Sequence, residues 1–202
     1  MKIFLISNNS LLEHISYDNT SNLDDIRMSR PLSIEGENIA KNALKKDFFN
    51  SVTKIYSSFY SSALSTSKYL SSYLEIPINM TTILNECKVG YLGSKNMKMV
   101  KGLQDHEFTY KLNGGESLVE VGSRIDNFIK SKYNSDGDIA IFTHKRAILG
   151  YLLKYSKVGY NLDENLILTF EGNVIYDDSE KLLDIYELTI EDNKLININC
   201  IN

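Results

Sequence analysis

The sequence predicts one α/β domain with three layers, in which helices cover both faces of a mainly parallel central sheet. Short apolar runs typical of buried strands alternate with longer stretches whose apolar residues recur every three or four positions. The length of 202 residues fits a single domain over residues 1–202, and a hydrophobic fraction of 43% is enough for a core. This composition excludes a disordered or collagen-like chain.

The first part of the chain is expected to contain two strands and two helices. The apolar run at residues 2–6 is too short for a helix and ends at polar residues, which predicts a buried strand. Residues 10–30 are polar and irregular, which predicts a loop. Ser33 is a good N-cap and predicts a helix after it. A second short strand precedes Ser57, and residues 63–74 have the apolar spacing of an amphipathic helix.

The middle of the chain has one long stretch of weak periodicity and then a clear helix. Residues 83–115 are expected to cross one face of the domain as an excursion or a lid over the pocket. The segment Ser117-Leu118-Val119-Glu120 is a capping box, which predicts that a helix begins there. Residues 139–143 are the clearest buried strand, and a helix is expected over residues 146–155.

The C-terminal part alternates between apolar and polar residues. Residues 166–170 and 184–190 show this pattern, and we expect both to form edge strands. Two histidines, His14 and His106, lie in polar segments and are expected on the surface.

Composition also limits the partners. The formal net charge is -4 and no basic block stands out, so we expect no nucleic-acid partner. No window reaches the roughly 18 apolar residues of a membrane span, and the N-terminal apolar run is too short for a signal peptide. We therefore expect a cytoplasmic protein without a membrane partner. Cys87 and Cys200 are expected to be reduced thiols, and no metal-ligand spacing or cofactor motif is recognised.

Polar clusters follow three of the predicted strands. They contain residues 7–10, the serines of residues 57–62, and residues 143–146. Ligands of open α/β sheets bind beyond the carboxyl ends of the strands, so we expect the three clusters to converge. His144 is the strongest candidate acid, base or anion ligand, since two cations follow it at a helix start, where positive charge opposes the helix dipole. The alternative is that the serines are turn formers and both cations point into water.

A series of segments occurs in a characteristic order. They are Met1–Ile6 before Ser7-Asn8-Asn9-Ser10, Pro31-Leu32-Ser33-Ile34-Glu35-Gly36, Tyr56-Ser57-Ser58, Leu84-Asn85-Glu86, Gly114-Gly115-Glu116-Ser117 and Thr143-His144-Lys145-Arg146. In this order the chain resembles the histidine phosphatase superfamily, which includes the phosphoglycerate mutases and many small-molecule phosphatases. The resemblance covers nearly the whole chain and implies a phosphoglycerate mutase-like fold.

The resemblance also implies that the active site has changed. In the family a histidine attacks phosphorus, two arginines and a second histidine hold the phosphoryl oxygens, and a glutamate protonates the leaving oxygen. By position, Asn8 replaces the nucleophile and Ser7 and Ser62 replace the arginines, while His144 and Glu86 are retained. An amide nitrogen cannot replace imidazole as a nucleophile, and serine lacks the charge of arginine. We therefore expect family-type turnover to be lost.

The leading hypothesis is a catalytically degenerate protein that binds a phosphorylated or anionic small molecule, or a protein partner. The resemblance places its ligand at Ser7, Asn8, Ser62, His144 and Lys145. Another hypothesis is that the pocket is vestigial and that only a surface patch matters, since tyrosines are abundant and aromatic residues are enriched at interfaces.

The alternative to degeneracy is an active phosphomonoesterase with rewired chemistry that uses His144 and Glu86. In that enzyme the missing arginines are replaced by cations from elsewhere in the chain, and the candidates are Arg27, Arg30, Lys145 and Arg146. A cation within hydrogen-bond distance of His144 would favour this hypothesis.

Overall fold

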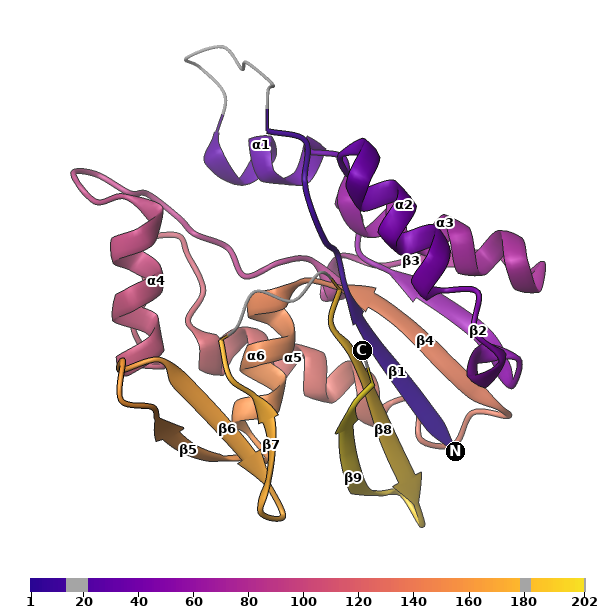
Figure 1. Ribbon diagram of the computed structural model, residues 1–202. Coiled ribbons are helices and arrows are strands. Elements are labelled where there is room, and N and C mark those ends of the chain that lie inside the picture. Colours follow the sequence, from indigo (N-terminus) through magenta and orange to yellow (C-terminus); the bar gives the residue numbers. More distant parts are fainter. Residues whose placement is uncertain (14–21, 179–182, 202) are drawn as a thin grey trace.

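A six-stranded sheet with the strand order β3-β2-β4-β1-β8-β9 forms the centre of the fold (Figure 1). Four of its strands run parallel to one another: β1 (Lys2–Ser7), β2 (Val52–Ser57), β3 (Ile78–Met80) and β4 (Asp138–Thr143). The strand β8 (Ile185–Glu191) pairs antiparallel with β1, and β9 (Lys194–Cys200) pairs antiparallel with β8. The computed structural model describes residues 1–13, 22–178 and 183–201, and it confirms the predicted mainly parallel sheet.

Helices cover both faces of the sheet, as predicted. On one face lie α2 (Ile34–Ala43) and α3 (Ser61–Leu74), and on the other α5 (Leu118–Lys130) and α6 (Lys145–Leu153) (Figure 1). Alternate side chains of a strand point to opposite faces, so Ile3 and Leu5 pack with α5 and α6, whereas Phe4 and Ile6 pack with α2 and α3. The central strands β1 and β4 are therefore buried on both faces, which is why each is a short continuous apolar run.

Two predicted helix caps are present. The Ser33 hydroxyl accepts a hydrogen bond from the Gly36 N–H at 3.0 Å and begins α2. Ser117 and Glu120 form both bonds of the capping box that begins α5. These contacts involve only residues close in sequence, and they could therefore be predicted from the sequence alone.

A second, antiparallel sheet has the order β5-β6-β7. Its strands are β5 (Lys157–Tyr160), β6 (Leu166–Phe170) and β7 (Asn173–Tyr176). The predicted strands at residues 166–170 and 184–190 exist, but the expectation that they are edge strands is wrong. β6 lies in the middle of its sheet, and β8 lies between β1 and β9. Alternating apolar and polar residues indicate that one face of a strand is buried and the other is exposed. Inner strands of an antiparallel sheet show this pattern just as edge strands do.

Two helices were not predicted. The first, α1 (Leu23–Ser29), lies within the predicted loop at residues 10–30, and the second, α4 (Met97–His106), lies within the excursion at residues 83–115. The side chains of Asn22 and Asn96 accept backbone N–H bonds at their N-termini. No residue of α1 is fully buried, and its seven residues are too few to show a clear apolar stripe in the sequence.

The described residues also include the short 3-10 helices η1 (Asp47–Phe49) and η2 (Thr82–Leu84). His106 is exposed, as expected, and its ring stacks on Tyr160 at 5.3 Å between centroids. His14 lies outside the described residues. No described helix is long and apolar enough to cross a membrane.

Candidate functional site

The three polar clusters predicted from the sequence converge at the carboxyl ends of β1, β2 and β4. The β1–β4 register pairs Ser7 with Thr143, and the β2–β4 register pairs Ser57 with Phe142. The next residues of the three strands are Asn8, Ser58 and His144, whose side chains meet. The register of the parallel sheet therefore assembles this site from segments far apart in the sequence.

His144 is the centre of the cluster, and both of its ring nitrogens are hydrogen-bonded. Nδ1 lies 2.7 Å from Asn8 Oδ1, and Nε2 lies 2.8 Å from Ser58 Oγ. Burial lowers the pKa of His144 from 6.5 to about 4, so the ring is neutral at pH 7. A neutral imidazole carries one N–H. Because Asn8 Oδ1 can only accept, Nδ1–H donates to it. The single proton of the Ser58 hydroxyl then lies between two acceptors, His144 Nε2 at 2.8 Å and Asn85 Oδ1 at 3.1 Å.

Tyr60 covers His144. The two ring centroids are 4.7 Å apart, and His144 is only 3% exposed. Burial raises the pKa of Tyr60 to about 12. The hydrogen-bonded side chains Ser58, His144 and Asn8 follow one another in the same order as a nucleophile, a base and an orienting group. However, Ser58 and His144 are buried, Asn8 is half-buried, and none of the three residues lines the two cavities described below. The three residues form a polar cluster whose hydrogen bonds are made within the protein.

Two of the other ligand-binding candidates, Ser7 and Lys145, contact Asp184. The Ser7 hydroxyl is fully buried and bonds both the carboxylate of Asp184, at 3.3 Å, and its backbone N–H, at 3.0 Å. Lys145 Nζ lies 3.8 Å from the same carboxylate. Ser62 is buried in the first turn of α3. Asp184 was missed by the sequence analysis, because its position beside Ser7 depends on the antiparallel pairing of β8 with β1.

Glu86 binds the beginning of α6 from outside the helix. Its Oε1 accepts the Cys87 N–H at 2.8 Å and the Ala147 N–H at 3.0 Å, and its Oε2 lies 3.5 Å from Arg146 N. The first N–H groups of a helix lack partners within it and carry partial positive charge. The buried Glu86 carboxylate satisfies one of them and offsets the unfavourable Lys145 and Arg146 charges at this helix end.

Replacing Glu86 with alanine is expected to destabilise the fold by about 2 kcal/mol, since two buried N–H groups lose their acceptor. Glu86→Gln keeps an oxygen at the same place and should lose less than half of that amount. Urea unfolding at pH 7 measures both variants. Equal losses for Gln and Ala would contradict the role of the oxygen as a cap.

The four cations proposed to replace the missing arginines bind elsewhere in the described chain. Arg27 donates to Cys87 O at 3.0 Å and pairs with Asp24 at 3.1 Å, and its Nη2 lies 4.0 Å from Glu86 Oε2. The remaining contacts join Arg146 to Asp105 and Gln104, Arg30 to Leu12 O, and Lys145 to Asp184. Within residues 1–13, 22–178 and 183–201, no cation is hydrogen-bonded to His144. The observation that would favour rewired chemistry is therefore missing.

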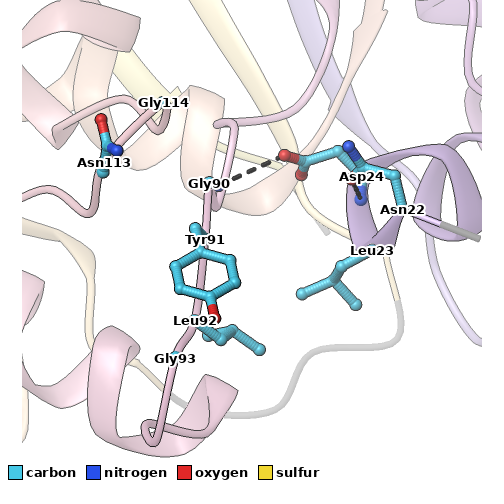
Figure 2. Close-up of a pocket in the computed structure, with 9 residues that line it drawn as sticks. All are labelled: Asn22, Leu23, Asp24, Gly90, Tyr91, Leu92, Gly93, Asn113 and Gly114. Carbon is cyan, nitrogen blue, oxygen red and sulfur yellow. Dashed lines mark hydrogen bonds between the residues drawn. The ribbon is translucent and has the colours of Figure 1, made fainter.

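Two cavities lie along the segment from Cys87 to Gly93. The larger, about 580 Å³, is lined by Asn22 and Asp24 near α1, by residues 90–93 and by Asn113 (Figure 2). Asp24 fixes α1 to this segment, because its carboxylate accepts the N–H groups of Val89 at 3.1 Å and Gly90 at 3.3 Å.

The smaller cavity, about 270 Å³, is lined by five cations. They are Arg27, Lys88, Lys98, Lys101 and Arg146. Among the described residues no group of three or more His, Cys, Asp or Glu side chains is placed to hold a metal ion.

Comparison with known proteins agrees with this geometry. The model of the histidine phosphatase superfamily (branch 1) matches residues 19–169. The solved mycobacterial glucosyl-3-phosphoglycerate phosphatase is 15% identical, with a TM-score of 0.66 over 99% of this chain and 96% of that chain. YhfR of Bacillus stearothermophilus is 16% identical, with a TM-score of 0.64 over 96% and 94%. The α-ribazole phosphatase of Shigella flexneri is 16% identical, with a TM-score of 0.57 over 86% and 96%.

These structural likenesses concern the fold, and no curated protein matches the chain in sequence. The family match covers most of the chain and includes His144, Ser58 and Glu86. The chain belongs to the histidine phosphatase superfamily.

Proposed function

We propose that the chain is a catalytically degenerate histidine phosphatase that binds a phosphorylated or otherwise anionic small molecule. The observation that carries the proposal is the hydrogen bonding of His144. The resemblance in the sequence assigns Asn8 to the position of the family's nucleophile, and its amide oxygen and the Ser58 hydroxyl contact both ring nitrogens. In this assignment the family position for catalysis holds a neutral, hydrogen-bonded cluster.

The chemistry of phosphoryl transfer supports the same proposal. Positive charge at the equatorial phosphoryl oxygens is central to this reaction, and a single arginine finger contributes about 10³–10⁵ in rate. Ser7 and Ser62 supply no such charge. Arg27 and Arg146 are paired with Asp24 and Asp105 instead. The absence of a nucleophile and, among the described residues, of positive charge at His144 therefore supports binding rather than phosphoryl transfer.

The proposal predicts that no phosphate is released from a broad panel of phosphomonoesters at high protein concentration. Wild type and His144→Ala should give the same background, while an active phosphatase in the same assay gives a signal. Release by the wild type that disappears in His144→Ala would overturn the proposal and establish a rewired enzyme centred on this histidine.

A further inference from the structure

We propose that the smaller cavity, and not the cluster around His144, binds the ligand, and that the ligand is a small amphiphilic anion with a phosphate or carboxylate group and an apolar body. This inference rests on the proposed function and gives it a location. The cavity lies where α1, the segment at residues 87–89, α4 and the start of α6 come together. Its volume of about 270 Å³ suits a small molecule.

Five cationic residues line this cavity, and three of them, Arg27, Lys101 and Arg146, are ion-paired with acidic residues outside its lining. Arg27 comes from α1, Lys88 from the connecting segment, and Lys98 and Lys101 from α4, while Arg146 comes from α6. The chain as a whole is acidic, with a formal net charge of -4, so this concentration of cationic residues does not reflect the composition. The larger cavity is a comparison within the same molecule. No lysine, arginine or histidine is among the described residues that line it (Figure 2).

Hydrogen bonds and ion pairs hold the two arginines of the cavity in place. Gln104 is 6% exposed, accepts a bond from Arg146 Nη2 at 3.1 Å, and donates to the carbonyls of Tyr110 and Glu116. Arg27 is fixed by Asp24 and by Cys87 O. Because both guanidinium groups already bind acceptors of the protein, we expect them to fix the wall of the cavity and the lysines to supply the charge that an anion meets.

The three lysines of the cavity differ in whether they form an ion pair with a described residue. Lys101 is paired with Asp178 at 3.2 Å. Lys88 and Lys98 are exposed and make no ion pair with any described residue, although Lys88 acts on Glu116 electrostatically and helps to lower the pKa of that carboxyl group. These two ammonium groups can therefore turn toward a bound anion without breaking an existing pair.

The apolar part of the lining indicates that the ligand is more than a free inorganic ion. Val89 and Val100 are 6% and 4% exposed, and the flexible Met97 side chain lies beside them. Cys87 also lines the cavity, and burial raises the pKa of its thiol to about 12, so it is a protonated apolar group rather than a nucleophile. The site therefore fits reversible binding.

Phenylphosphonate is a suitable probe, because its P–C bond is not a phosphatase substrate. Isothermal titration should show binding to the wild type that weakens with added salt, and weaker binding of inorganic phosphate and of benzyl alcohol, which each carry one half of the probe. The Lys88→Gln/Lys98→Gln double variant should bind about tenfold more weakly, because two charge-assisted contacts are lost. Lys45→Gln/Lys46→Gln removes the same charge away from the cavity and should bind as the wild type does.

His144→Ala separates this inference from the proposed function, and thermal unfolding confirms that each variant is folded. Unchanged binding in His144→Ala supports the cavity. Loss of binding in His144→Ala but not in the Lys88/Lys98 variant would overturn the inference and leave a degenerate protein that binds at the family pocket. Equal affinities of the two lysine double variants, or no binding of phenylphosphonate at all, would also overturn it. Phosphate release that depends on His144 would overturn the proposed function alone.

Discussion

Gly122→Ala is expected to destabilise the fold by about 4 kcal/mol or more, which is exceptional for the addition of one methyl group. Gly122 lies on the buried face of α5, directly against α6. A Cβ atom there would lie 2.0 Å from Gly150 O and 2.4 Å from Gly150 C. These are backbone atoms and cannot rotate away, so the two helices would have to separate. That movement would open the core around Val121 and Ile125, two buried residues of the same helix.

The matched control is the same substitution in α4. Gly102 is helical and exposed, and a Cβ atom there would meet nothing within 4 Å. Gly102→Ala should stabilise the fold by about 0.5–1 kcal/mol, because alanine loses less conformational freedom on folding. Urea unfolding measures both variants. A loss of less than about 1 kcal/mol for Gly122→Ala would show that α5 and α6 can move apart cheaply.

The central layers could be predicted from the sequence because their signals are local. The apolar runs of β1 and β4 and the caps at Ser33 and Ser117 depend only on residues close in sequence. The helix α1 could not be predicted this way. Its position depends on the carboxylate of Asp24, which accepts the N–H groups of Val89 and Gly90. These two hydrogen bonds join residues that are separated by 65 and by 66 positions in the sequence.

The same distinction holds at the site. His144 could be singled out because it directly follows the clearest strand, and strand topology indicates that Asn8 and Ser58 lie nearby. The packing of Tyr60 on His144 and the contact of Ser7 with Asp184 depend on side-chain orientation and on antiparallel pairing, which no local pattern reports. The resemblance assigned Glu86 to the position of a family acid. Its binding to the start of α6 depends on which helix begins beside it in space.

Acidification is expected to remove about 3 kcal/mol of folding free energy through His144 alone, since each unit of pKa difference is worth about 1.4 kcal/mol. Burial lowers the pKa of His144 from 6.5 to about 4; Glu86 opposes this shift, and Arg27 and Arg124 add to it. The unfolded chain binds a proton at this residue below about pH 6.5, and the folded chain only below about pH 4. The stabilisation is therefore complete above pH 6.5 and is lost as the pH falls toward 4. At 3% exposure, solvent screens this residue little.

His144→Gln isolates the effect, because glutamine also offers a donor and an acceptor but does not titrate. Urea unfolding of both proteins between pH 7.5 and pH 4 should give curves that converge by about 3 kcal/mol as the pH falls. Carboxyl groups elsewhere titrate in both proteins, so their contribution cancels in the difference. Parallel curves would mean that His144 has the same pKa in the folded and the unfolded chain, and would contradict the prediction. A wild type that gains stability relative to His144→Gln as the pH falls would mean that the folded chain holds the imidazolium. The imidazolium would then donate from both nitrogens, and the cluster with Asn8 and Ser58 would be a cationic anion site rather than a neutral one.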